Sequence, residues 1–301
     1  MWTTKDMSAQ TGKIAIVTGA NTGIGYEIAL ALYRAGAHVI MACRDLAKAE
    51  EATQRMKQEG GAGTLEGALI DLSRLDSVRS FAHLLLERYE NLDLLINNAG
   101  IMVPPAGKTV DGFELQFGIN FLGHFALTGH LLPLLSKTNG ARVVTLSSGA
   151  HHLVNGIDYE NLRLEKPYDA QREYAVSKLA NILFSIELQR RIEQTGMSLI
   201  SNAAHPGVTD SNLSRYMPAD VYETAVKQFN GLMPTWQGAL PALYAATSPA
   251  AQGGLYYGPD GEDGLHGYPA EAQVSSAAAD EAEAAKLWRY AETATGVSYS
   301  F

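Results

Sequence analysis

A tyrosine and a lysine one helical turn apart could form an acid/base pair, although helices often contain this spacing by chance, so the interpretation depends on the residues that accompany it. Tyr174 and Lys178 lie in a stretch, about residues 172–194, whose pattern predicts a long helix, so their side chains share one face. A lysine ammonium about 5 Å away, at an effective dielectric of about 20, favours the phenolate by roughly 3 kcal/mol, or about two pKa units. Because a free tyrosine has a pKa of ~10, the pair predicts a general acid/base that works nearer neutrality.

Hydroxyl and amide side chains could assist such a base. Ser147 and Ser148 follow an apolar run at 142–146 that predicts a strand, and a serine hydroxyl there can hydrogen-bond a substrate oxygen. Asn120 lies inside a second predicted long helix, about residues 111–136, where an asparagine amide competes for backbone groups. Asn120 therefore either serves the site or is a polar position on a kinked helix.

A glycine-rich turn joins the first predicted strand to the first predicted helix. It reads Thr-Gly-Ala-Asn-Thr-Gly-Ile-Gly over residues 18–25. Glycines let the backbone approach a ligand, and the free N–H groups at a helix amino end favour a pyrophosphate. The Gly-x3-Gly-x-Gly spacing differs from the Gly-x-Gly-x-x-Gly fingerprint. The turn predicts a cofactor-binding loop, with a plain tight turn as the alternative.

These residues must be positioned by the elements of the first two hundred residues, where short apolar runs alternate with helical patterns. The predicted strands cover about residues 14–18, 39–43, 65–70, 92–96, 142–146 and 198–204. This βαβ rhythm requires right-handed crossovers. It predicts an α/β fold of one domain over residues 1–301, with a Rossmann-type doubly wound parallel sheet of about seven strands and helices on both faces.

The pattern loosens after Pro206. Residues 211–235 mix large apolar with polar positions, which predicts either core packing or, as the favoured interpretation, a lid over an apolar substrate. The remaining expected elements are a short helix at 236–247 bent near Pro241, an edge strand at 255–257, and a C-terminal extension at 258–301 with a helix near 280–290.

Composition limits the possible partners. The chain has 301 residues, with 23 basic and 32 acidic side chains and a net charge of −9, so no nucleic-acid partner is expected. The single cysteine, Cys43, indicates a reducing compartment. No secretion signal and no apolar run of ~18 residues is visible, so we expect a cytoplasmic protein without a transmembrane anchor. His151 and His152 lack ligand partners at metal spacing, and no metal is expected.

Four motifs together resemble the short-chain dehydrogenase/reductase family over roughly residues 12–260. They are Thr18-Gly-x3-Gly-Ile-Gly25, Asn97-Asn98-Ala99-Gly100, Tyr174-x3-Lys178 and His205-Pro206-Gly207. Finer features are similar to the branch that contains retinol dehydrogenases, WW-domain oxidoreductase and protochlorophyllide reductase. These are Ala42-Cys43-Arg44-Asp45, Ser147-Ser148-x2-His151-His152 and Ser177-Lys178-Leu179-Ala180-Asn181.

The resemblance implies a catalytic set of four residues: Asn120, Ser148, Tyr174 and Lys178. The family's serine corresponds to the second of the pair, and Ser147 is the structural alternative. Tyr174 follows Ser148 by 26 residues, an interval longer than the family's commonest one and comparable with that of the named branch. The family's asparagine holds a water that links the lysine to bulk solvent.

The resemblance also implies a nicotinamide cofactor, NADP(H) in preference to NAD(H). NAD-preferring members carry an acidic side chain where this chain has Cys43, and Arg44 next to it offers a forked partner for a phosphate. The alternative for Arg44 is an exposed arginine at the start of a helix. Asp71 could cap the helix that begins near Leu75, either instead of contacting the cofactor or in addition to it. The expected cofactor-binding residues are Gly19, Asn21, Thr22, Gly23, Ile24, Gly25, Arg44, Asp71, Leu72, Asn98, Ala99, Gly100, Tyr174, Lys178, Pro206, Gly207 and Thr209.

The expected function is an NADP(H)-dependent oxidoreductase that interconverts a carbonyl and an alcohol on an apolar small molecule, with Tyr174 as general acid/base. Two alternatives are a reductase of C=C bonds, as in the protochlorophyllide branch, and a non-catalytic NADPH-binding regulator. The resemblance also implies a homo-dimer or homo-tetramer joined through the two long helices.

Overall fold

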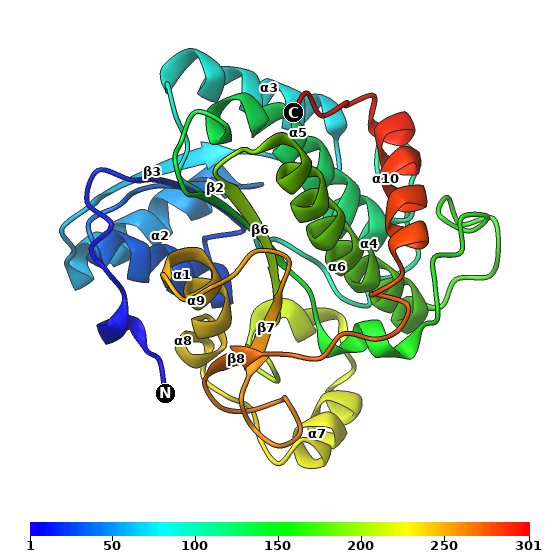
Figure 1. Ribbon diagram of the computed structural model, residues 1–301. Coiled ribbons are helices and arrows are strands. Elements are labelled where there is room, and N and C mark those ends of the chain that lie inside the picture. Colours follow the sequence, from blue (N-terminus) through cyan, green and yellow to red (C-terminus); the bar gives the residue numbers. More distant parts are fainter.

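A sheet of eight strands divides the molecule into two helical layers (Figure 1). The computed structural model describes residues 1–301. The strand order is β3-β2-β1-β4-β5-β6-β7-β8, with every neighbouring pair parallel except β7 and β8. The strands are Ile14–Thr18 (β1), His38–Cys43 (β2), Thr64–Leu69 (β3), Leu94–Asn97 (β4), Ala141–Leu146 (β5), Leu199–Ala204 (β6), Tyr256–Pro259 (β7) and Pro269–Glu271 (β8). The predicted α/β fold is confirmed.

The side of the sheet formed by its last strands, β7 and β8, differs from the expectation. The strand expected at the edge, β7, lies parallel beside β6 and is covered on its other side by β8, which makes an eighth strand instead of about seven. Gly258 of β7 lies opposite Ala270 of β8. The β8 segment is only three residues long and begins with a proline, so it carries no strand pattern of its own.

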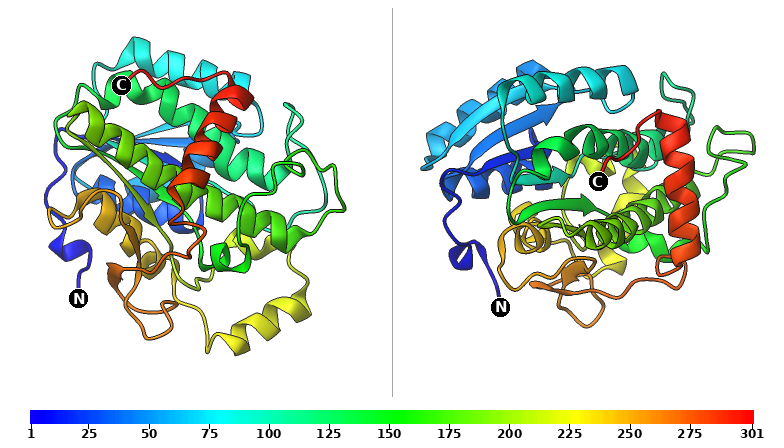
Figure 2. Two further views of the ribbon diagram at one scale, coloured as in Figure 1. Left: turned by 45° about the vertical axis from the view of Figure 1, so that its right-hand side comes forward. Right: turned by 45° about the horizontal axis from the view of Figure 1, so that its top comes forward.

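The central strands are apolar because helices cover both faces of the sheet (Figure 2). Ile16 of β1, for example, lies opposite Ile40 of β2 and Leu95 of β4, and all three are buried. One layer contains α1 (Gly23–Arg34), α2 (Leu46–Glu59), α8 (Thr235–Gly238) and α9 (Leu240–Thr247). The other contains α3 (Leu75–Arg88), α4 (Leu115–Phe117), α5 (Gly123–Leu135), α6 (Ala170–Thr195) and α10 (Glu281–Thr295).

The remaining helical segments lie outside these layers. They are the 3-10 turns η1 (Thr4–Asp6), η3 (Gly149–Leu153) and η4 (Asn212–Tyr216), and the helix α7 (Ala219–Gln228). No helix of the structure combines the length and the apolar character that a bilayer crossing requires.

The expected long helix at 111–136 is divided into three parts. The short α4 leads into a π-helix over Gly118–Leu122 (η2), which leads into α5. A Cβ at Gly118 would collide with Thr109, and one at Gly123 would lie 2.8 Å from the Leu72 carbonyl oxygen. The glycines therefore allow close packing where the backbone hydrogen bonding changes between α-helical and π-helical. A π-helix often marks a functional position.

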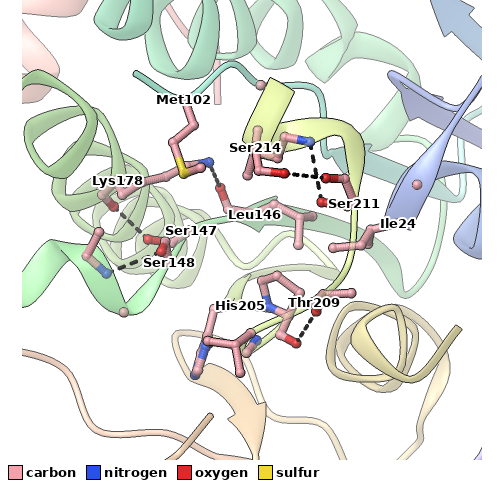
Figure 3. A pocket seen from close by; sticks show the side chains of 18 of the residues that line it. Ile24, Met102, Leu146, Ser147, Ser148, Lys178, His205, Thr209, Ser211 and Ser214 are labelled. Carbon is pink, nitrogen blue, oxygen red and sulfur yellow. Dashed lines mark hydrogen bonds between the residues drawn. The ribbon is translucent and has the colours of Figure 1, made fainter. Parts of the chain in front are cut away.

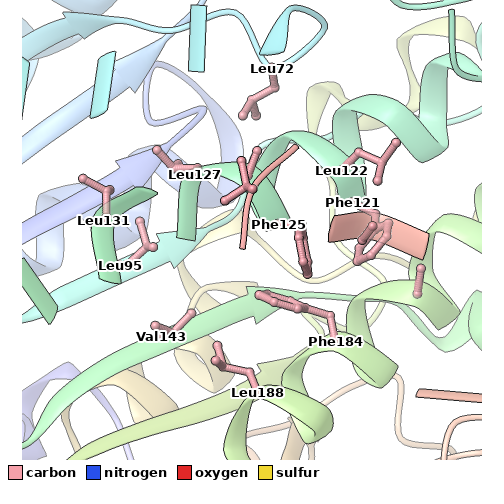
Figure 4. Packing of buried hydrophobic residues seen from close by; sticks show 14 of the residues in the cluster. Leu72, Leu95, Phe121, Leu122, Phe125, Leu127, Leu131, Val143, Phe184 and Leu188 are labelled. Carbon is pink, nitrogen blue, oxygen red and sulfur yellow. The ribbon is translucent and has the colours of Figure 1, made fainter. Parts of the chain in front are cut away.

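Phenylalanine and leucine side chains pack together between α5, α6 and the sheet (Figure 4). The rings of Phe125 on α5 and Phe184 on α6 have centroids 5.6 Å apart, and Trp288 of α10 lies 5.2 Å from Phe125. The Tyr299 hydroxyl donates a hydrogen bond of 2.7 Å to the Phe125 carbonyl. The C-terminal extension thus covers the outer side of α5 and α6. The expected homo-oligomer through these helices stays a prediction, and its contacts would have to accommodate α10.

The N-cap residue of α4 is a buried carboxyl. Glu114 is fully buried, and its Oε2 accepts a 2.6 Å hydrogen bond from the Phe117 N–H, while Oε1 has no partner. Burial raises the pKa of Glu114 to about 7. Because this pKa exceeds that of the unfolded chain, its contribution to stability is complete below about pH 4.5 and is lost as the pH rises through 7.

We therefore predict that Glu114→Gln removes part of the pH dependence of stability. Wild type and variant should unfold at similar temperatures near pH 5, and the wild type should lose stability relative to the variant by up to a few kcal/mol at pH 8.5. Thermal unfolding across this range measures the difference, with Glu90→Gln at an exposed position as the control. A constant difference between wild type and Glu114→Gln at all pH values would contradict the prediction.

Candidate active site

A large cavity of about 1970 Å³ lies along the carboxyl ends of the parallel strands. Its walls come from the segments that follow β1, β2, β3, β4, β5 and β6, and from η4 and α7. Crevices at this edge are where open α/β sheets bind their ligands. All the expected cofactor-binding residues line the cavity, as do Ser148, Tyr174 and Lys178, whereas Asn120 does not.

The glycine turn after β1 is shaped to hold an anion. Gly19 and Gly23 have positive φ angles of 67° and 58°, which glycine adopts without strain. A Cβ at Gly25 would collide with Asn98 and would lie 2.5 Å from the Gly19 carbonyl oxygen. The N-cap residue of α1, Thr22, makes no side-chain capping bond, so the first N–H groups of the helix stay available. This cradle fits the pyrophosphate of a dinucleotide.

The ends of β1 and β4 are tied together beneath this turn. The Asn98 side chain donates a 2.7 Å hydrogen bond to the Thr18 carbonyl. The Thr18 hydroxyl oxygen accepts 2.9 Å hydrogen bonds from the N–H groups of Asn98 and Ala99. The Asn98 amide is therefore occupied within the protein, and the segment 98–100 borders the cavity.

The residues after β2 and β3 form the far wall. Arg44 is exposed and takes part in no ion pair or hydrogen bond, while its neighbour Asp45 pairs with Lys48. Asp71 accepts hydrogen bonds from the N–H and hydroxyl of Ser73.

The alternative assignment of Asp71 as the cap of α3 is wrong. Arg74 is the N-cap residue and makes no side-chain capping bond, and the Leu75 N–H donates a 3.0 Å hydrogen bond to Asp111. The cap comes from a distant segment, so local spacing could not identify it.

The two serines after β5 have different surroundings (Figure 3). The Ser147 hydroxyl donates a 2.7 Å hydrogen bond to the Lys178 carbonyl and so fastens β5 to α6. The Ser148 hydroxyl accepts a 3.2 Å hydrogen bond from the Ala150 N–H and lies close enough to Tyr174 to lower the pKa of its phenol. Ser148 is thus the serine placed to share a ligand with Tyr174.

The expected lowering of the Tyr174 pKa by Lys178 is wrong for this structure. Burial raises the pKa of Tyr174 to about 12, against the smaller opposing effect of Ser148, and burial lowers the pKa of Lys178 to about 8. The Lys178 ammonium is 5.6 Å from the tyrosine ring centroid and donates a 3.1 Å hydrogen bond to the Leu146 carbonyl. Loss of hydration therefore outweighs the attraction between the two groups, and Tyr174 is a phenol at neutral pH.

Asn120 lies behind the cavity wall, in the π-helix. Its Oδ1 accepts a hydrogen bond from the Ile101 N–H, and its Nδ2 donates to the Ile101 carbonyl and to the Ser177 hydroxyl, all within 2.9 to 3.0 Å. The amide holds the segment after β4 against α6. The water expected at Asn120 stays a prediction.

The segment after β6 forms the other side of the cavity. The Thr209 hydroxyl donates a 3.0 Å hydrogen bond to the Pro206 carbonyl, and the His205 Nδ1 accepts one of 3.3 Å from the Gly207 N–H (Figure 3). The imidazole of His205 thus supports a turn. Beyond it, η4 and α7 occupy the predicted lid at 211–235 and line the cavity without any buried residue. Their movement stays a prediction.

Tyr256 of β7 is a site residue that sequence reasoning missed. Its side chain lines the cavity, only 3% of its surface is exposed, and its hydroxyl completes no hydrogen bond. Ser147 lies close enough to affect the pKa of this phenol, and the rings of His151 and His205 pack against it at 5.5 and 4.9 Å. Its strand was expected at the sheet edge, and no local signal placed its hydroxyl here. No group of three or more His, Cys, Asp or Glu side chains could hold a metal ion.

Comparison with known proteins identifies the relatives of this chain. The family model described as short chain dehydrogenase matches residues 13–221. Mouse retinol dehydrogenase 14 is 40% identical over 97% of this chain and 88% of its own length. Mouse retinol dehydrogenase 11 is 47% identical over 68% of this chain and 64% of its own length.

Two solved structures are similar to this chain in sequence and fold. An uncharacterized protein from Mycobacterium paratuberculosis is 40% identical, covers 100% of this chain and 99% of its own, and superposes with a TM-score of 0.83. RhlG of Pseudomonas aeruginosa, solved as an NADP active-site complex, is 27% identical with a TM-score of 0.66, over 82% of this chain and 94% of its own.

The buried Lys178 predicts a pH-dependent affinity for NADPH. The ammonium is positive below its pKa of about 8 and loses its charge above it, so attraction for an anionic cofactor is present below pH 8 and falls above it. Fluorescence titration from pH 6.5 to 9.5 should show the dissociation constant rising by up to about tenfold per pH unit above pH 8.

Two variants test whether Lys178 causes this change in affinity with pH. Lys178→Met should bind NADPH weakly and without the change near pH 8. Lys48→Met, which removes an exposed lysine of the same cavity, should keep the change. The same pH dependence in wild type and Lys178→Met would refute the assignment to Lys178.

Proposed function

The chain belongs to the short-chain dehydrogenase/reductase family, and from this premise we propose that it is an NADP(H)-dependent oxidoreductase that interconverts a carbonyl and an alcohol. The observation that carries the proposal is the position of two hydroxyls at one cavity. Ser148 follows β5 and Tyr174 comes from α6, and the two lie close enough for Ser148 to lower the pKa of the phenol. Two hydroxyl donors side by side suit a single carbonyl oxygen.

The protonation state of Tyr174 defines its part in the reaction. A phenol with its pKa raised to about 12 keeps its proton at neutral pH and can donate it to the oxygen of a carbonyl substrate. The Ser148 hydroxyl donates a hydrogen bond to the same oxygen and orients it. In the oxidation direction, Tyr174 accepts the proton of the alcohol.

Lys178 supports the charge that this transfer leaves behind. Its ammonium lies 5.6 Å from the phenol ring, and it is positive below its pKa of about 8, so it stabilises a tyrosinate during turnover. The nicotinamide cofactor supplies or accepts the hydride. The glycine turn, the segment 98–100 and the segment 206–209 would hold it along the cavity.

The residues at the end of β2, where the chain lines the cavity, support the proposed cofactor preference. Cys43 stands where a carboxylate would repel a 2′-phosphate, and the exposed guanidinium of Arg44 at the cavity has no protein partner. A free guanidinium at Arg44, with no carboxylate at position 43, favours NADP(H). The single cysteine is buried and free, which fits the reducing cytoplasm that we propose as the compartment.

The proposed substrate is an apolar alcohol or the matching aldehyde or ketone. The lid segment presents Met217, Val221, Phe229 and Leu232 to the cavity. Retinol dehydrogenases, the similar curated proteins, are named for an alcohol substrate. The chain has the family's catalytic serine, tyrosine and lysine at Ser148, Tyr174 and Lys178, which favours catalysis over a purely regulatory role.

Tyr174→Phe tests the catalytic role. Loss of the phenolic proton should lower kcat for carbonyl reduction by about 10²- to 10⁴-fold, because general acid catalysis contributes on that order. The dissociation constant of NADPH should change by less than about threefold, since the ring remains. Steady-state kinetics on a panel of aldehydes and ketones measure the effect, and Tyr33→Phe on α1, outside the cavity, is the control. Turnover near that of the wild type would refute the role.

Arg44→Ala tests the coenzyme preference. The variant should raise KM for NADPH by about tenfold or more while leaving KM for NADH within about twofold, because only NADPH carries the 2′-phosphate. Arg34→Ala, which removes a guanidinium paired with Glu59 on the surface, should change neither constant. Equal effects on both coenzymes would assign Arg44 to general surface charge.

A further inference from the structure

His124 is a fully buried histidine between the glycine turn and α6, the helix that carries Tyr174. The proposed reaction does not use it. It lies at the second residue of α5, next to the π-helix. Its Nδ1 is 3.0 Å from the Asn120 carbonyl oxygen, and its Nε2 is 2.9 Å from the Thr18 hydroxyl oxygen. Both ring nitrogens therefore have a protein partner.

The partners determine which nitrogen carries the proton. A carbonyl oxygen can only accept, so Nδ1 must donate to Asn120. The ring is neutral at physiological pH because burial lowers the pKa of His124 to about 4. A neutral ring protonated at Nδ1 has a bare Nε2 that can accept the hydrogen of the Thr18 hydroxyl. The other acceptor for this hydrogen, the Ile96 carbonyl, is 3.3 Å from the Thr18 hydroxyl oxygen, whereas Nε2 is 2.9 Å from it, so Nε2 is the nearer partner.

The contacts of His124 extend in two directions. On one side, the Thr18 oxygen receives the N–H groups of Asn98 and Ala99 at the cavity wall, each at 2.9 Å. On the other side, Asn120 donates to the Ser177 hydroxyl at 3.0 Å, and Ser177 donates to the Tyr174 carbonyl at 2.7 Å. A continuous set of buried hydrogen bonds and peptide segments thus connects the glycine turn to Tyr174.

We propose that His124, as the neutral Nδ1–H tautomer, is a positioning residue that fixes the glycine turn relative to the Asn120–Ser177–Tyr174 segment. The inference rests on the proposed oxidoreductase function. A buried network in which every donor has an acceptor permits one arrangement, so the contacts to Thr18 and to Asn120 fix the two halves of the site relative to each other.

Two amide variants separate the two contacts. In His124→Asn, the side-chain NH₂ replaces Nδ1–H and keeps the bond to Asn120, but nothing reaches Thr18. In His124→Gln, the side-chain oxygen replaces Nε2 and accepts from Thr18, but the bond to Asn120 is lost. We expect His124→Asn to raise the NADPH dissociation constant about tenfold with kcat at saturating NADPH within about threefold of wild type.

His124→Gln should show the opposite pattern. Its NADPH dissociation constant should stay within about threefold of wild type, and its kcat should fall about tenfold or more. His130→Asn, at a partly exposed position of the same helix, should change neither quantity. Parallel losses in both variants, or wild-type values in both, would overturn the proposal, because a merely structural role would not produce a crossed pattern.

A readout without turnover tests the tautomer itself. Long-range ¹H–¹⁵N spectra of protein labelled at histidine should contain a ring protonated at Nδ1 and bare at Nε2 that is unchanged from pH 5.5 to 8.5 and absent from His124→Asn. His151, whose Nδ1 faces the Ser148 carbonyl and whose Nε2 accepts from the Ser275 N–H, should give a second ring of this kind that remains in the variant. Protonation at Nε2, or titration within this range, would overturn the proposal. If the wild type binds NADPH but reduces no substrate, the proposed function fails, while the spectra and the NADPH affinities still decide the role of His124.

Discussion

The chemistry of this site depends on the burial of Tyr174 and Lys178 in one cavity wall. Both groups lose hydration, which favours the neutral form of each: the phenol keeps its proton, and the pKa of the ammonium falls to about 8. A phenol with its proton is a suitable donor to a carbonyl oxygen. The tyrosinate left after transfer needs a nearby cation, and Lys178, one helical turn away, is the group in place to supply it.

The fold brings these groups together through the shared edge of a parallel sheet. The ends of β1 and β4 are joined by the contacts between Thr18 and the Asn98–Ala99 backbone, and β5 is joined to α6 by Ser147. Local close packing allows these ties: Gly25 has no room for a Cβ, and the π-helix carries Asn120 toward Ile101 and Ser177. The same layer that supplies the catalytic helix is closed on the outside by α10.

Local patterns predicted the features that depend on neighbouring residues. Apolar runs located the strands to within about two residues, and the glycine turn and the Tyr174–Lys178 pair were identified because their spacing is short. Features set by distant segments were missed: the Asp111 cap of α3, the three-residue β8 and the unpartnered hydroxyl of Tyr256. The π-helix at Gly118–Leu122 is about one turn long, which is too short for its apolar spacing to be told apart from that of the surrounding α-helix in the sequence. The pKa of Tyr174 was mispredicted because the depth of burial arises only from tertiary packing.

The most direct test is the ionisation of Tyr174 in the cofactor-free protein. Titration of tyrosines labelled with ¹³C at Cζ, with Tyr174→Phe to assign the signal, reports the protonation state of this one phenol. The Tyr174 signal should keep the chemical shift of a neutral phenol from pH 6 through pH 10, because its pKa lies near 12. A Tyr174 signal that titrates below pH 10 would show that Lys178, rather than burial, controls the phenol, and would contradict this account.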